Sequence, residues 1–129
     1  MAKDGTDYSA YGLSDLASGY GKGDVTDMSD QNKVNQFAAD MWEVFDGAGN
    51  LLLKKHRDYG PTNISLSPGG PLNGLRVRMH DKTARINHLI DSGATPENES
   101  LRDSFIDLLN YSAIALMVLD GVWPEADCD

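Results

Sequence analysis

Hydrophobic residues recur along the chain at the spacing of amphipathic helices, and no segment alternates convincingly between polar and apolar residues as a strand does. The first helical pattern begins near Asp30 and ends at Gly60 and Pro61, where glycine favours a C-cap and proline prevents continuation. Gly47 and Gly49 each cost about 1 kcal/mol relative to alanine, which allows a kink or a break there. The apolar face of this helix contains Phe37, Met41, Val44, Phe45, Ala48 and Leu52.

Two further helices are predicted in the second half of the chain. One spans about residues 74–91, and its apolar stripe is expected to be buried. That stripe consists of Leu75, Met79, Ile86 and Ile90. The other begins near Pro96 or Glu97 and continues to about Gly121. Its second half, residues 113–119, is apolar on every side and must be central or covered by another subunit. The prediction is an all-α fold, a small bundle of three main helices.

The segments outside these helices have no regular period. Residues 1–30, rich in Gly, Asp, Ser and Tyr, predict a flexible or irregular acidic arm. Residues 31–124 then form the folded helical domain, and residues 125–129 an acidic tail. Residues 60–73 contain three of the five prolines. A connection of this length inside a small domain is uncommon and often functional, although a plain spacer is the alternative.

Charge is distributed unevenly along the chain. The sequence has 11 Lys and Arg against 20 Asp and Glu, a net charge of −9, and much of the excess acidity lies at the two ends. Seven cations gather between residues 54 and 85, namely Lys54, Lys55, Arg57, Arg76, Arg78, Lys82 and Arg85. This cluster could receive a phosphorylated small molecule or form a solvated basic face. It is too modest for binding duplex DNA, which usually requires a basic domain.

Membrane-spanning segments, secretory signals and disulfides bear on the cellular location that we expect. No apolar run approaches the roughly 20 residues that span a bilayer, and the N-terminus has no apolar core of a secretory signal. The one cysteine, Cys128, excludes an internal disulfide. We therefore expect a soluble protein of the cytoplasm that makes no membrane contact.

A stripe of acidic and amide residues follows one side of the third predicted helix. It consists of Glu99, Asp103, Asp107 and Asn110, which cover an arc of about 80°. Asp107 and Asn110 should be partly buried, because the stripe leads into the apolar half. A buried carboxylate is costly unless it is paired or bound to a metal. One alternative is a salt-bridge network with the charged stripe of the second helix, which contains Arg78, Asp81, Lys82 and Arg85. The other is Mg²⁺, to which Asp40 or Glu43 could contribute.

Residues 55–60, Lys-His-Arg-Asp-Tyr-Gly, combine cations, a carboxylate and an aromatic ring at a helix end. The cations suit a phosphate, and Tyr59 offers a stacking face to a base. The alternative is a helix C-terminus whose cations complement the macrodipole, with Tyr59 as a half-buried anchor. Trp42 and Trp123 are interpreted as core or interface anchors.

Three ordered blocks of this sequence together resemble a known family. They are residues 55–60 (KHRDYG), 78–85 (RMHDKTAR) and 98–111 (NESLRDSFIDLLNY). The family is the phage-encoded nucleotide modification associated domain of the first type, and the resemblance covers about residues 35–120. It implies an α-helical protein encoded near genes of nucleotide metabolism and base modification.

A looser similarity is to the MazG-like all-α nucleoside triphosphate pyrophosphohydrolases, which hold Mg²⁺ with acidic motifs on neighbouring helices. The corresponding segments here would be Asp40-Met-Trp-Glu43 and Asp107-Leu-Leu-Asn110. The first is short of a carboxylate, and the second ends in an amide, which binds Mg²⁺ more weakly.

The acidic stripe, the basic cluster and the long loop occur within one small bundle. Together with the resemblance, they lead to the hypothesis of a nucleotide-binding protein of phage origin, with Mg²⁺-dependent pyrophosphate hydrolysis of a nucleoside triphosphate as one form of it. Glu43, Asp103 and Asp107 would then hold the metal and serve catalysis. The expected nucleotide contacts are Lys55, Arg57, Asp58, Tyr59, Arg78, Asp81, Lys82, Arg85, Asn110 and Tyr111. One alternative is a binder without catalysis that sequesters a nucleotide or a nucleotide second messenger of host defence. Another is an interaction protein that uses its acidic arm.

The predicted helices also indicate an oligomer. Three helices in about 90 residues bury limited surface, and a helix that is apolar on every side needs cover on each of them. A homodimer that pairs the third helices would provide this cover.

Overall fold

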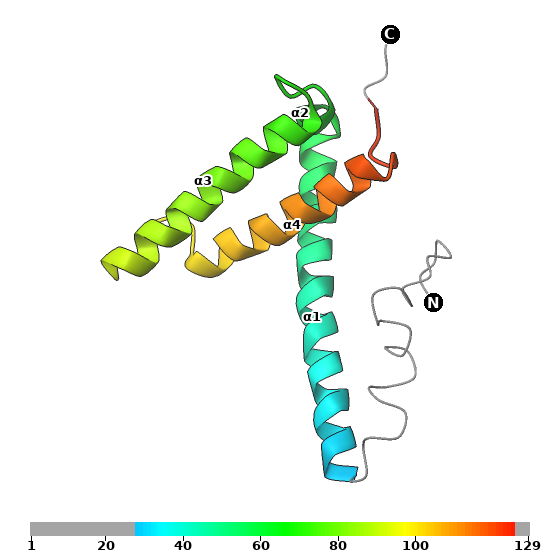
Figure 1. Cartoon of the computed structure of the whole chain (residues 1–129), viewed down its shortest axis with the longest axis vertical. Coiled ribbons are helices and arrows are strands. Elements are labelled where there is room, and N and C mark those ends of the chain that lie inside the picture. The colour runs from blue at the N-terminus through cyan, green and yellow to red at the C-terminus, as the bar shows by residue number, and fades with distance from the viewer. Residues whose placement is uncertain (1–27, 126–129) are drawn as a thin grey trace. The chain divides into compact units, whose positions relative to one another are not determined.

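A computed structural model of the chain describes residues 28–125 and contains helices but no strand in that range. The helices are α1 (Met28–Tyr59), α2 (Thr62–Ser65), α3 (Pro71–Ser92) and α4 (Leu101–Leu119) (Figure 1). The all-α prediction is therefore confirmed. The predicted arm and tail lie almost entirely outside the described residues, except that residues 28–30 form the first turn of α1. None of the described helices combines the length and the hydropathy that crossing a membrane requires.

The chain divides into two compact units, Met1–Phe45 and Asp46–Asp129. In the first unit, the described residues form the N-terminal part of α1, and several of its large apolar side chains are exposed to solvent. Phe37, Trp42 and Val44 are examples. The Trp42 and Phe45 rings lie 5.9 Å apart between centroids. This part of α1 thus presents hydrophobic surface, and Trp42 does not anchor a core among the described residues.

The helix α1 continues through Gly47 and Gly49 without the interruption that these residues allow. Ala48, which lies between the two glycines, is buried, and its carbonyl oxygen accepts a 3.0 Å hydrogen bond from Asn110 Nδ2. The burial of Ala48 and this hydrogen bond from α4 favour the uninterrupted helix despite the low helix propensity of the two glycines. The helix ends at Tyr59, and Gly60 after it has a φ of 65°, the left-handed conformation that glycine adopts readily.

The boundaries of α3 and α4 differ from the predicted ones because of local capping. Proline is favoured in the first turn of a helix, and α3 begins at Pro71. In α4, Ser100 Oγ accepts a 3.0 Å hydrogen bond from the Asp103 backbone amide, and the Asp103 carboxylate accepts one from the Ser100 amide. This capping box sets the first residue of α4 at Leu101. Glu99 therefore precedes the helix, and the prediction that it belongs to a helical stripe is wrong.

The core of the second unit lies where the C-terminal end of α1 meets the helices α2, α3 and α4. Ile64 of α2, Leu75 of α3 and Ile114 of α4 are almost completely buried. Leu52, Tyr111 and Trp123 pack around them. The Trp123 indole Nε1 donates a 3.2 Å hydrogen bond to the Pro61 carbonyl oxygen. Trp123 is therefore a core anchor, as predicted.

The helices α3 and α4 run side by side in opposite directions (Figure 1). Leu75 and Ile86 of the predicted apolar stripe of α3 are buried. Ile90, predicted to be buried with them, is instead exposed. It lies in the last turns of α3, and α4 begins later than predicted and leaves Ile90 without cover.

Candidate functional site

A pocket of about 320 Å³ opens in the second unit between α1, α2, α3 and α4. This volume is within the range of small-molecule sites, roughly 300–1,000 Å³. Its apolar wall is formed by Leu52, Ile64 and Ile114, and its rings are those of His56, Tyr59, Tyr111 and Trp123. Its other side chains of interest are the charged Lys55, Arg78 and Asp107 and the amides Asn63 and Asn110. The pocket therefore combines apolar, aromatic, cationic and hydrogen-bonding groups.

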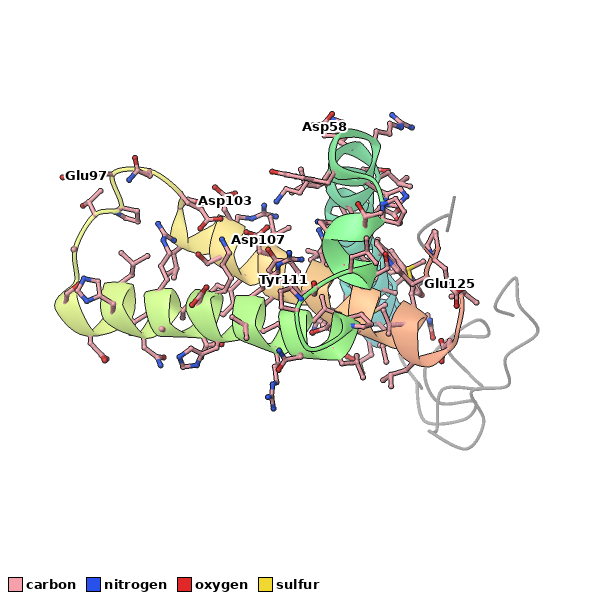
Figure 2. The ribbon with its side chains drawn as sticks, turned by 90° about the horizontal axis from the view of Figure 1, so that it is seen from above. Asp58, Glu97, Asp103, Asp107, Tyr111 and Glu125 are labelled. Carbon is pink, nitrogen blue, oxygen red and sulfur yellow. The ribbon has the colours of Figure 1, made fainter. Side chains whose placement is uncertain are left out.

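Two helical stripes with the same spacing line this pocket. The stripe of α1 is Leu52, Lys55, His56 and Tyr59, and the stripe of α4 is Asp107, Asn110, Tyr111 and Ile114. Positions i, i+3, i+4 and i+7 share one face of a helix, so each helix presents four side chains to the pocket. Figure 2 shows Asp107 and Tyr111 on the side of α4 that faces the end of α1, with Asp58 turned away from them.

Asp107 connects the pocket with the ion pairs between α3 and α4. Its Oδ1 accepts a 2.9 Å hydrogen bond from Lys55 Nζ, and its Oδ2 lies 2.8 Å from Lys82 Nζ. Lys82 Nζ also donates to both carboxylate oxygens of Glu99, at 2.9 Å each. The salt-bridge network expected between this buried carboxylate and the charged stripe of α3 is therefore present, through Lys82.

Ser104 and Arg85 complete this ion-pair network. The Ser104 hydroxyl is fully buried, accepts a 2.7 Å hydrogen bond from Arg85 Nη1 and donates to Glu99 Oε2 at 3.3 Å. Arg85 also donates to the backbone carbonyl oxygens of Glu99 and Ser100. Lys55, Lys82 and Arg85 thus face only Asp107 and Glu99, which leaves the network with one excess positive charge.

The network shifts the pKa values of its two central groups. Burial, the largest single effect, lowers the pKa of Lys82, but the hydrogen bonds and charges of Asp107 and Glu99 outweigh it and leave that pKa above its ordinary 10.5. Burial likewise raises the pKa of Asp107, and the hydrogen bonds from Lys82 and Lys55 outweigh it, so that this pKa falls below its ordinary 3.8. Both groups are therefore charged at neutral pH.

Two of the three residues predicted to bind Mg²⁺, Asp103 and Asp107, have other partners in the structure. The Asp103 carboxylate caps α4, Asp107 has an ammonium group at each oxygen, and Glu43 belongs to the first unit. Among residues 28–125, no three His, Cys, Asp or Glu side chains form a group that could hold a metal ion. A Mg²⁺ site at Glu43, Asp103 and Asp107 stays a prediction, and it would require Asp107 to exchange its ammonium partners for the metal.

The residues predicted to contact a nucleotide fall into three groups. Those that line the pocket are Lys55, Tyr59, Arg78, Asn110 and Tyr111. Lys82 and Arg85 belong instead to the ion-pair network. Arg57, Asp58 and Asp81 are exposed and do not line the pocket.

Several pocket residues were not predicted as site residues. They are Leu52, His56, Gly60, Asn63, Ile64, Ile114 and Trp123. The i, i+3, i+4, i+7 relation of Leu52 and His56 to Lys55 and Tyr59 is a signal that the sequence did contain. No such signal marks Asn63 in the one-turn helix α2. The backbone carbonyl oxygen of Asn63 accepts a 2.9 Å hydrogen bond from Arg78 Nη2.

Comparison with known families places these residues in one domain. The family of the nucleotide modification associated domain 1 matches residues 55–119, just over half of the chain. The chain belongs to this family. No curated protein and no solved structure matches it, and the looser similarity to MazG-like enzymes is not supported by any match.

The nucleotide modification associated domain contains the whole ion-pair network and most of the pocket. Its match begins at Lys55 and continues through α2 and α3 to the last residue of α4. Of the pocket-lining residues, Leu52 and Trp123 lie outside the matched range. The residues that give the pocket its charge are therefore all within the domain that defines the family.

Proposed function

We propose that the nucleotide modification associated domain of this chain binds a phosphorylated nucleoside in the pocket. The observation that carries the proposal is that Lys55 and Arg78 line the same pocket as the rings of Tyr59 and Tyr111. Charge-assisted hydrogen bonds from ammonium and guanidinium groups suit a phosphate. Aromatic rings suit the flat face of a base. The family description, which refers to nucleotide modification, agrees with this ligand class.

The electrostatics of the pocket favour an anionic ligand although the chain carries −9 overall. Two cations, Lys55 and Arg78, line the pocket against the one carboxylate of Asp107, which also pairs with Lys82 behind the pocket. The side chain of Lys55 is 46% exposed, so its ammonium group is accessible from the pocket. When the Lys55 ammonium group moves from Asp107 to a phosphate, the ion pair between Lys82 and Asp107 would remain.

The nucleoside would occupy the apolar part of the pocket. Tyr111 packs against the buried core, which fixes the position of its ring. The Asn110 amide nitrogen is held by the Ala48 carbonyl oxygen, and its own carbonyl oxygen makes no hydrogen bond among the described residues. That oxygen could accept a hydrogen bond from an amino group of a base. A volume of about 320 Å³ suits one nucleotide rather than an oligonucleotide.

Binding without hydrolysis is the function that this geometry supports best. A metal ligand or general base needs carboxylate oxygens that are free to accept a cation or a proton. Both oxygens of Asp107 instead accept from ammonium groups. In the proposed complex Lys82 keeps one oxygen of Asp107 paired, and no second carboxylate among the described pocket-lining residues is present to complete a metal site when Lys55 moves.

Isothermal titration calorimetry would test the proposal. Nucleoside mono-, di- and triphosphates, and the matching nucleosides, would be titrated in EDTA and again with Mg²⁺, with recovered ligand analysed by chromatography. We expect binding in EDTA that depends on the phosphate and returns the ligand intact. No binding of any nucleotide, or equal binding of the nucleosides, would contradict the proposal. Turnover with Mg²⁺ would favour the pyrophosphohydrolase.

Two neighbouring lysines provide a matched pair of variants for the same experiment. Lys55 lines the pocket, whereas Lys54 is exposed and does not line it. We expect Lys55→Ala to weaken nucleotide binding about tenfold or more, since hydrogen bonds to charged groups contribute roughly 1.5–3 kcal/mol. Lys54→Ala should bind as the wild type does. Equal effects of the two substitutions would place the phosphate elsewhere.

A further inference from the structure

The helix α4 carries a second apolar stripe on the side opposite its buried residues. Phe105, Leu116 and Leu119 are 51%, 61% and 66% exposed. The buried side of the helix contains Ser104, Asp107, Asn110 and Ile114. At 100° per residue, the exposed stripe lies about half a turn away from the centre of that buried side. The stripe consists of Phe105, Leu109, Ser112, Leu116 and Leu119.

The spacing of this stripe is that of a helix-pairing seam. Its members are separated by four, three, four and three residues, which is the alternation of the two core positions of a seven-residue repeat. None of the five is charged, and the small Ser112 at the centre allows close approach of another helix. Exposed apolar residues in this arrangement are typical of a surface that packs against a second helix.

Two oppositely charged residues stand at the ends of the seam. Arg102 and Asp120 are 18 residues apart, which is five helical turns, so they lie on the same edge of α4. Both are exposed, and neither side chain takes part in an ion pair within residues 28–125. They are about 27 Å apart along the helix axis and cannot pair with each other in one chain.

We propose that this seam binds the same seam of a second copy of the chain, with the two α4 helices antiparallel about a twofold axis. Such an axis keeps the shared edge on one side, so Arg102 of each copy lies beside Asp120 of the other. In the same alignment Phe105 of each copy faces Leu116 of the other, and Leu109 faces Ser112. Antiparallel packing also aligns the helix dipoles favourably. A parallel pair would bring like charges to the same end.

Charge reversal of the full-length chain tests this arrangement, with sedimentation velocity as the measure of the dimer dissociation constant. Arg102→Glu and Asp120→Arg should each weaken the dimer about tenfold, because each creates two like-charge contacts. The double variant should restore the dimer. Each single reversal also places a charge that suits its own helix end, so unfolding of α4 is not expected, and circular dichroism would verify this.

A second pair of variants tests the apolar seam itself. Leu116→Glu should convert the dimer to a monomer, whereas Val77→Glu on α3, at a site 52% exposed, should leave the dimer intact. A wild-type chain that is monomeric at every concentration would overturn the proposal. So would a dimer that survives Leu116→Glu. A dimer that Leu116→Glu abolishes but that single charge reversals leave unchanged would overturn the antiparallel arrangement.

Discussion

Asp107 is the residue on which both the pocket and the packing of α3 against α4 depend. One of its oxygens binds Lys55 at the pocket, and the other binds Lys82 behind it. A buried carboxylate is tolerated only when its partners are present, and its partners need it for the same reason. A change at this position therefore leaves two ammonium groups close together without the negative charge between them.

The first prediction concerns the substitution Asp107→Asn. We expect it to lower the free energy of unfolding at pH 7 by about 2–3 kcal/mol, because it removes the charge from two partly buried ion pairs. The native pKa of Asp107 lies below its ordinary 3.8. The carboxylate therefore contributes its full stability above the unfolded pKa and loses it as the pH falls through the native pKa. The difference between wild type and variant should thus be constant above about pH 5 and shrink below pH 4.

Urea denaturation followed by circular dichroism at several pH values would measure this difference. Asp58→Asn is a suitable control, because Asp58 is exposed and forms no ion pair among the described residues. It should change the stability by less than about 0.5 kcal/mol. A difference for Asp107→Asn that persists unchanged at pH 3 would show that its cause is not the charge.

At the scale of the elements, hydrophobic spacing predicts the three long helices but not all of their ends. A stripe such as Leu75 and Ile86 recurs over several turns and so marks a helix wherever its end falls. The start of α4 is instead set by the reciprocal hydrogen bonds of Ser100 and Asp103. The pattern Ser-x-x-Asp at residues 100–103 is a helix-start signal in the sequence, and it places Glu99 outside the helix. The single turn of α2 is too short to produce any period.

The second prediction concerns two glycines with different backbone conformations, one inside α1 and one directly after its last residue. At Gly47 an added Cβ meets no atom within 4 Å, and the residue is helical. Gly47→Ala should therefore raise the stability by about 0.5–1 kcal/mol and the melting temperature by a few degrees. Gly60 has a φ of 65°, and Gly60→Ala should destabilise the chain by about 1–2 kcal/mol. Thermal melts followed by circular dichroism would measure both. Destabilisation by Gly47→Ala would mean that α1 is interrupted there.

At the scale of the whole molecule, pairing between charged residues is easier to predict from the sequence than the position of a cavity. A buried carboxylate on α4 needs a cation, and the cations of α3 were one of the two partners expected for it. Lys82 of α3 meets Asp107 of α4 accordingly. The participation of Lys55 depends on how the end of α1 packs against α4, which no local pattern specifies. The same holds for Trp123, whose place at the pocket follows from its hydrogen bond to Pro61, 62 residues away.

The pocket and the exposed seam lie on opposite sides of α4, which makes nucleotide binding and dimer formation separable. Asp107 and Tyr111 line the pocket, and Phe105, Leu116 and Leu119 form the exposed side. A ligand that binds only the folded chain stabilises it by about 2.7 kcal/mol at one hundred times its dissociation constant. Dimer formation has a related effect, but it depends on the concentration of the chain itself.

The last prediction uses this difference in one set of thermal melts. The melting temperature of the wild type should rise as its concentration increases a hundredfold, because dimerisation favours the folded state. Leu116→Glu should abolish this dependence while a saturating nucleotide still raises its melting temperature by several degrees. Lys55→Ala should show the reverse, with the concentration dependence kept and the nucleotide effect reduced. If Leu116→Glu removed both effects, the two sites would be coupled, and the pocket would need the second copy to be complete.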